Sequence, residues 1–212
     1  MMAALLALQG LPRTPRMLVE RSCVSCFLTV VVLESEDAGE WSGLGDCVVL
    51  CGARPGNVGS TLRLCAMLGM AGLVVVGLTP GKRRKATELA GIGEGEGVTI
   101  VAPPAEMEAA EVLLRLRASG HRLVGLTAHG EDVQPLWRAQ LTLPGTAFVL
   151  GRENDGIPSD AEELLDEALT IPMEVSGEEG SLNVSHAAAV LLYERQRQLE
   201  GEQEFSWHAS CT

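Results

Sequence analysis

The loop at residues 53–63 places an asparagine and an arginine among glycines. Asn57 follows a Pro-Gly pair, and Arg63 comes six residues later. Glycine lets the backbone approach a ligand closely, and the N–H groups of a helix N-terminus can bind an anion. Arg63 lies off the apolar stripe of the helix expected there. It is therefore either a ligand-binding group or an ordinary surface arginine.

Two later loops carry further polar groups. In residues 151–158 glycines bracket Glu153, and residues 171–185 place Ser181 and Asn183 at the start of a helix. A plain turn held by Asn and Asp side chains is the alternative for the first loop, and one serine or asparagine of the second must cap the helix. Such a density of polar groups is unusual for plain connections, so we expect the three loops to form a ligand-binding site.

The elements that must hold these loops follow from short apolar segments. We expect strands at residues 26–33, 47–51, 73–77, 98–101, 123–126, 147–150 and 169–171. Helical spacing predicts helices at 60–69, 106–119, 159–168 and 184–201, and the polar, glycine-rich residues 80–97 are assigned no element. This alternation predicts an α/β fold, with a mostly parallel sheet covered by helices on both faces. Ligands bind at the carboxyl ends of such strands, where the three loops lie.

The composition excludes several classes of protein. The 212 residues carry a net charge of −12, with 46% hydrophobic residues and 3% aromatic residues. A disordered chain would be less apolar, a polybasic nucleic-acid binder would not be acidic, and a base-stacking sheet needs more rings. We expect an extension at residues 1–44, a domain at 45–199 and an acidic tail at 200–212.

The expected compartment is the cytoplasm. No apolar stretch reaches the ~18 to 20 residues that a membrane helix needs. Residues 1–19 contain Arg13 and Arg16 and no acidic residue, so an organellar presequence within residues 1–20 is the alternative.

The cysteines offer a zinc alternative that we do not favour. Cys23 and Cys26, followed by Cys47 and Cys51, loosely imitate a zinc ribbon, but the second spacing is wrong for one. Three of these cysteines lie in apolar, strand-like sequence, which is typical of buried intracellular thiols. The four histidines are scattered, and we expect no metal.

Taken in order, the three loops resemble the three motifs of the SpoU class of SPOUT methyltransferases, which includes the TrmH-type ribose methylases. The resemblance covers about residues 45–199. It implies a C-terminal trefoil knot formed by residues 169–171 and 181–194, a homodimer, and S-adenosyl-L-methionine bound in the knot. It also implies methylation of a ribose 2′-hydroxyl in RNA, with tRNA expected and rRNA as the alternative. A catalytically silent knotted RNA-binding or scaffold protein is a further alternative.

The resemblance also implies site residues. The catalytic cluster would be Asn57, Arg63, Glu153, Ser181 and Asn183. The cofactor would be contacted by Leu126, Thr127, Leu150, Gly151, Gly156, Ile171, Met173, Ser181 and Leu182. Members of the family are proposed to use the arginine as a base. A guanidinium is a poor base, so we expect Arg63 to clamp an RNA phosphate instead.

The distribution of charge supports an RNA-binding edge. The expected RNA contacts are Arg54, Arg63, Lys82, Arg83, Arg84, Lys85 and Arg152, all in or near the loops at one end of the sheet. Acidic residues concentrate elsewhere, at 34–40, 88–111, 160–167 and after 200. A local basic face governs docking more than net charge does, so we expect weak RNA binding with a small salt dependence.

Overall fold

The fold is given by a computed structural model, which describes residues 18–19, 31–33, 41, 43–91, 98–128, 133–152, 155–174 and 181–202. Its strands are β1 (Leu18–Val19), β2 (Val31–Leu33), β3 (Cys47–Leu50), β4 (Gly72–Val75), β5 (Thr99–Val101), β6 (Arg122–Leu126), β7 (Gln134–Pro135), β8 (Thr146–Leu150) and β9 (Glu167–Thr170). Its helices are α1 (Pro55–Met67), α2 (Pro80–Ala90), α3 (Ala109–Ala118), the 3-10 turn η2 (Leu136–Arg138), α4 (Ser159–Glu162) and α5 (Val184–Glu202).

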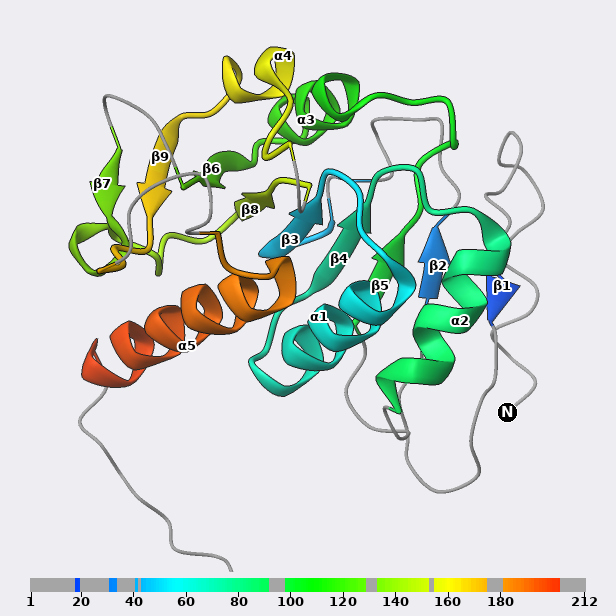
Figure 1. Ribbon diagram of the computed structural model, residues 1–212, viewed down its shortest axis with the longest axis horizontal. Coiled ribbons are helices and arrows are strands. Elements are labelled where there is room, and N and C mark those ends of the chain that lie inside the picture. Colours follow the sequence, from blue (N-terminus) through cyan, green and yellow to red (C-terminus); the bar gives the residue numbers. More distant parts are fainter. Residues whose placement is uncertain are drawn as a thin grey trace, which may run out of the picture.

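The strands form one sheet in the order β1-β2-β5-β4-β3-β8-β6-β9-β7 (Figure 1). Among the described strands only β1 and β2 pair antiparallel, and every other pair is parallel. The predicted α/β fold with a mostly parallel sheet is therefore confirmed.

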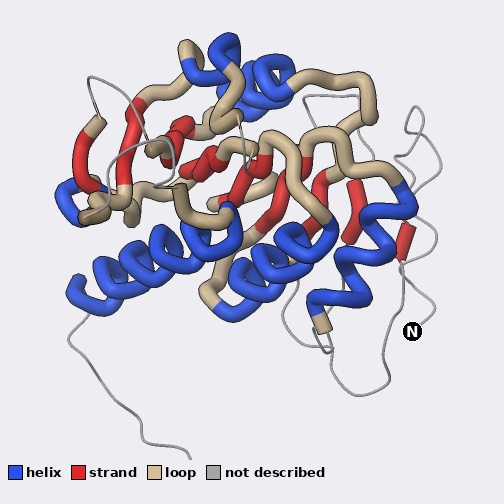
Figure 2. The backbone as a smooth tube through the Cα atoms, viewed as in Figure 1, coloured by secondary structure: helices blue, strands red, loops and turns tan. Residues whose placement is uncertain are grey.

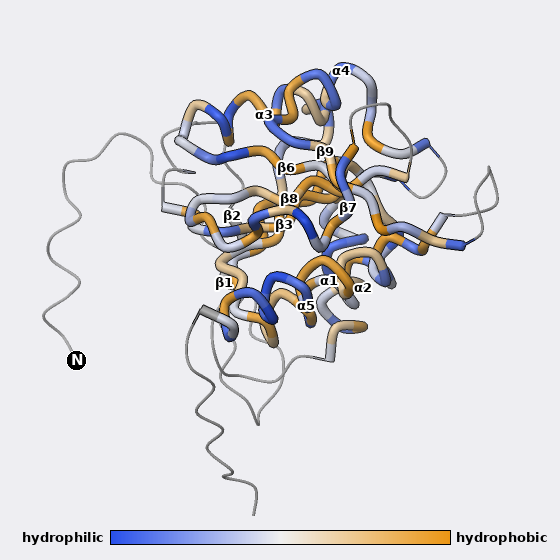
Figure 3. The backbone as a smooth tube through the Cα atoms, turned by 90° about the vertical axis from the view of Figure 1, so that its left-hand side faces the viewer, coloured by the Kyte–Doolittle hydropathy of each residue, from blue (hydrophilic) through white to orange (hydrophobic). Residues whose placement is uncertain are grey.

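Helices cover both faces of the sheet, as predicted. The helices α1, α2 and α5 lie on one face, and α3 and α4 lie on the other (Figures 1 and 2). Alternate residues of the buried strand β3 point to opposite faces of the sheet. Val48 packs in the hydrophobic cluster between the sheet and helices α1 and α5, and Val49 packs in the cluster between the sheet and α3. Figure 3 accordingly shows hydrophobic segments concentrated between the helical layers.

Two helices differ from the sequence-based expectation. α1 begins at Pro55, five residues before the predicted start, and α2 occupies residues 80–90, to which no element had been assigned. Each helix has proline in its first turn, where the missing N–H costs nothing and the fixed φ favours the helix. Gly91 ends α2 in the left-handed conformation, with φ of +55°.

The predicted helix at residues 159–168 was wrong in length. α4 is a single turn over residues 159–162, and residues 167–168 belong to β9. The Ser159 side chain makes no capping hydrogen bond, and Pro158 holds the N-cap position. β9 pairs with β6 on one side and β7 on the other, so tertiary pairing overrode local helix propensity.

Both ends of the chain are only partly described. Of the strand predicted at residues 26–33, the last three residues form β2, which pairs with β1 on one side and with β5 on the other. The remaining N-terminal residues of that prediction, and the tail after residue 202, lie outside the described residues. α5 continues through Gly201, where it was expected to end. In the described part of the chain, no helix is both long and apolar enough to span a membrane.

The three described cysteines are core residues, as the sequence suggested. Cys47, Cys51 and Cys65 are free and buried. Burial raises the pKa of the Cys51 and Cys65 thiols to about 12 and also raises that of Cys47, because a thiolate loses its hydration there. Cys23 and Cys26 lie outside the described residues.

These thiols make the stability of the fold depend on alkaline pH. Because their folded pKa values are raised, their contribution is complete below about pH 9 and is lost as the pH rises toward 12. We expect the free energy of unfolding, measured by urea titration in reducing buffer, to fall between pH 8.5 and 10.5. Each thiol adds a slope of up to about 1.4 kcal/mol per pH unit. The Cys65→Ala variant should show a shallower fall, and an unchanged slope in that variant would contradict the assignment.

Candidate active site

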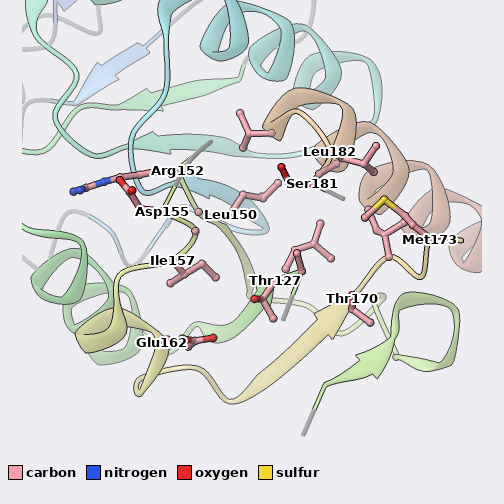
Figure 4. Close-up of a pocket in the computed structure, with 17 residues that line it drawn as sticks. Thr127, Leu150, Arg152, Asp155, Ile157, Glu162, Thr170, Met173, Ser181 and Leu182 are labelled. Atoms are coloured by element: carbon pink, nitrogen blue, oxygen red, sulfur yellow. The ribbon is translucent and has the colours of Figure 1, made fainter. Parts of the chain in front are cut away.

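A cavity of about 360 Å³ opens at the carboxyl ends of β6, β8 and β9, beside the start of α5. The strand register creates it. Leu150 at the end of β8 is paired with Leu50 of β3 and with Leu126 of β6, and Leu126 is paired with Leu169 of β9. The chain segments that follow these strands therefore leave the sheet together and wall the cavity (Figure 4).

All nine predicted cofactor residues line this one cavity. They are Leu126, Thr127, Leu150, Gly151, Gly156, Ile171, Met173, Ser181 and Leu182. Sequence reasoning had not assigned a cofactor contact to eight further lining residues, namely Ala128, Arg152, Asp155, Ile157, Glu162, Thr170, Val184 and Ala187. Most of these lie next to a predicted residue. Glu162 is not adjacent to any predicted residue in the sequence, and only the tertiary fold brings α4 to the cavity wall. The role of each residue toward a ligand stays a prediction.

The glycine loop is tightly closed on itself. The backbone N–H of Arg152 donates to the Gly156 carbonyl at 2.7 Å, and the N–H of Gly156 donates back to the Arg152 carbonyl at 3.1 Å. A Cβ atom at position 151 would lie 2.1 Å from the carbonyl carbon of Gly156. Gly151 is therefore required because two backbone segments meet there, and Gly156 because its φ is +69°.

Two of the predicted catalytic residues contact each other. Nδ2 of Asn183 donates to Oδ1 of Asn57 at 3.2 Å, which joins the start of α5 to the first turn of α1. Oδ1 of Asn183 accepts from the backbone N–H of Ser185 at 2.9 Å and from its hydroxyl at 2.7 Å. Asn183 is thus the residue that caps α5, and Ser181, two residues earlier, is left to line the cavity.

Arg63 does not join this pair within one chain. Its Nη1 donates to the carbonyl of Ala90 at the end of α2, at 3.4 Å. Six helical residues advance about 600°, so Arg63 and Asn57 project from different sides of α1. Glu153, the fifth residue of the predicted cluster, lies outside the described residues. The roles of Arg63 and Glu153 remain predictions.

The predicted RNA contacts are mostly exposed, with one exception. Arg54, Lys82, Arg84, Lys85 and Arg152 are exposed. Arg83 differs from the others, because it is only 4% exposed, so the structure does not favour it as an RNA contact. Helical periodicity explains this, because one residue of four consecutive basic residues must face inward.

Of the predicted RNA-contacting residues, Arg152 also lines the cavity. Its Nε donates to the backbone carbonyl of Cys51 at 3.2 Å, and its side chain lines the cavity. Arg54 precedes α1 directly, at the end of the β3 loop. Arg84 pairs with Glu88 at 3.9 Å on the exposed side of α2, where such a pair contributes little stability.

Comparisons with known proteins identify the family to which this fold and cavity belong. Residues 47–193 match the model of the SpoU rRNA Methylase family. The 23S rRNA (uridine(2479)-2'-O)-methyltransferase of Streptomyces viridochromogenes is 33% identical over 147 residues, which are 68% of this chain and 49% of that protein. The chain belongs to the SpoU rRNA methylase family.

Other SpoU-family relatives differ in their named substrates. The tRNA (guanosine(18)-2'-O)-methyltransferase of Escherichia coli strain K12 is 29% identical, over 68% of this chain and 59% of its own length. The SpoU methyltransferase AviRb of Streptomyces viridochromogenes, solved in complex with AdoMet, has a TM-score of 0.55 and 28% identity, over 73% of this chain and 57% of that one. The chain thus spans about half the length of the relatives it matches first.

The SpoU-family cavity should not tolerate a side chain at position 151. We expect Gly151→Ala to lower the free energy of unfolding by about 1–3 kcal/mol, because the new methyl group meets backbone that must shift. Gly81→Ala is the matched control: nothing lies within 4 Å of the added Cβ, and alanine favours the helix. Urea unfolding measures both variants. Equal stability of Gly151→Ala and the wild type would show that the loop is not closed as described.

Proposed function

We propose that this chain is an S-adenosyl-L-methionine-dependent methyltransferase that methylates ribose 2′-hydroxyl groups in RNA. The observation that carries the proposal is the convergence of all nine predicted cofactor residues on one cavity, beside the Asn57–Asn183 pair, in a SpoU-family fold. Relatives are named for both tRNA and 23S rRNA, so tRNA remains the expected substrate and rRNA the alternative.

The residues of the cavity fit the cofactor. Leu126, Leu150, Ile157 and Ile171 offer apolar walls for an adenine ring, and the volume is in the range of small-molecule sites. Backbone N–H and C=O groups of the segments around residues 126–128 and 150–152 can bind its polar edge. The bound cofactor supplies an activated methyl carbon, which needs no metal.

The protein must then position the hydroxyl and help to remove its proton. Ser181 lies on the cavity wall, and the Asn183 amide is held by α5 and by Asn57, so these polar groups are fixed before substrate arrives. A guanidinium does not release its proton at neutral pH, so Arg63 would bind an RNA phosphate and polarise the nearby hydroxyl. Arg54 and Arg152, at the mouth of the same sheet edge, would bind neighbouring phosphates.

We also propose a homodimer in which Arg63 serves the cavity of the partner. Met67 of α1 and Val190 and Tyr193 of α5 are large apolar side chains left exposed on the described surface, which supports burial by a second chain. Arg63 lies on the side of α1 that faces α2, away from Asn57 and Asn183 of its own chain. This placement supports a site to which two chains contribute, because the predicted catalytic cluster is incomplete within one chain.

A trefoil knot in the C-terminal part is a further element of the proposal. β9 pairs inside the sheet, between β6 and β7, and residues 171–173 and 181–187 contribute to one cavity. The meeting of these two segments supports the knot.

The Asn57 and Arg63 side chains should both be needed for transfer. With methyl-labelled cofactor and total tRNA or rRNA, we expect Asn57→Ala and Arg63→Ala to lose at least 100-fold of the transfer rate, the scale of loss when a positioned polar group is removed. Cofactor affinity of Arg63→Ala should stay within about threefold, since Arg63 does not line the cavity of its own chain and is proposed to bind an RNA phosphate. Mapping the labelled nucleotide identifies the substrate. Tight cofactor binding with no transfer to any RNA would favour the scaffold alternative.

Mixing the two inactive variants tests the shared site. After co-expression, a heterodimer of Asn57→Ala and Arg63→Ala contains one intact site if Arg63 acts on its partner, and we expect about a quarter of wild-type activity in the statistical mixture. No recovery of activity would place Asn57 and Arg63 in the site of the same chain. Light scattering of the wild type checks that the dimer forms.

A further inference from the structure

Charged residues stand on opposite parts of the cavity wall. Among its described lining residues, Asp155 and Glu162 are acidic and Arg152 is basic. Arg152 and Asp155 both line the cavity from the loop that follows β8, where Nε of Arg152 donates to the Cys51 carbonyl. Glu162 comes from α4 on a separate part of the wall, and its carboxylate is directed toward Thr127 (Figure 4).

The Glu162 carboxylate is not neutralised by a described cation. Its backbone N–H donates to Pro158, and its carbonyl accepts from Leu165, so its peptide groups are satisfied within the α4 turn. The ion pairs of the described residues engage other carboxylates, those of Asp46, Glu88, Glu111, Asp166, Glu167 and Glu194. Glu162 is an exposed residue, so water and salt screen its charge, and the charge acts only over a short range within the cavity that the residue lines.

This charge matters if the cavity binds the proposed cofactor, and the inference rests on that proposed function. The cofactor carries a positively charged sulfonium, whereas the demethylated product carries a neutral thioether. The adenosine and amino-acid parts of the two molecules are the same. Apolar walls, and hydrogen bonds to the parts that the two molecules share, therefore treat both alike. A negative charge on the wall favours the sulfonium over the thioether electrostatically.

We propose that Glu162 is a specificity-determining residue that makes the cavity favour the sulfonium form of the cofactor over its thioether product. The carboxylate attracts the charged form and has no comparable attraction for the neutral one. Occupation by fresh cofactor is thus favoured, and the product is released more readily. Asp155 contributes less, because the cationic Arg152 lines the cavity from the same loop.

Binding rather than activity tests the proposal. Isothermal titration calorimetry of the full chain with S-adenosylmethionine and with S-adenosylhomocysteine gives the ratio of the two Kd values. We expect Glu162→Gln to raise Kd for S-adenosylmethionine about three- to tenfold at low salt, and to change Kd for S-adenosylhomocysteine less than about twofold. Asp155→Asn should shift the ratio less, and added salt should reduce the effect.

Two further variants separate charge from structure. Glu162→Asp keeps the charge on a shorter side chain, so it should keep most of the wild-type ratio even if it weakens both ligands. Glu163→Gln is the matched control, because it removes the same charge from the next residue, which is exposed and does not line the cavity. We expect its ratio to equal that of the wild type.

The outcomes are distinguishable. Equal weakening of both ligands by Glu162→Gln would mean that Glu162 bonds a part they share, and would overturn the proposal. An unchanged ratio, or the same shift in Glu163→Gln, would overturn it as well. If the wild type binds neither ligand, the proposed function itself fails and the inference fails with it. Binding of both ligands with no selective effect of Glu162 would leave the proposed function standing.

Discussion

The site depends on the parallel register of β3, β8, β6 and β9. Their last paired residues, Leu50, Leu150, Leu126 and Leu169, stand level across the sheet. Parallel strands direct their carboxyl ends to the same edge, so four connections leave together and can enclose a ligand between them. A slip of one residue in any of these pairs would turn each strand's side chains to the opposite layer and separate the loops.

Helix α5 forms one wall of the cavity at this edge of the sheet, and several contacts hold it in place. At its start, Asn183 caps the helix and bonds Asn57 of α1. Further along, Arg195 forms a buried ion pair with Asp46, whose other oxygen accepts from the backbone N–H of Thr146 at 3.0 Å, so α5 is tied to the beginning of β3 and β8. The Gln198 amide then bonds the backbone of Ala139 and Leu141. An anchored helix gives the cavity one rigid wall and presents the catalytic candidates from it.

Short apolar runs predicted the central strands well, because a strand buried on both faces can hardly be built otherwise. Prediction failed where tertiary pairing or local geometry competed with composition. Residues 167–168 continue a helical pattern but pair with β6, and the basic stretch after Pro80 is helical because proline and αL glycine define its ends. The burial of Arg83 has the same origin, because a helix turns one residue of the four consecutive basic residues toward the protein interior.

The sequence by itself determined the α/β class and the three polar loops, because these depend on periodicity and on residue types at fixed spacing. The resemblance to the family supplied nine of the residues that line the cavity. Only the tertiary structure decided how the loops combine. It paired Asn57 with Asn183, carried Arg63 away from both, and brought Glu162 of α4 to the cavity wall. Such contacts join residues more than a hundred positions apart, or turn on which side of a helix a side chain leaves. They are set by strand order and helix packing, which local sequence does not encode.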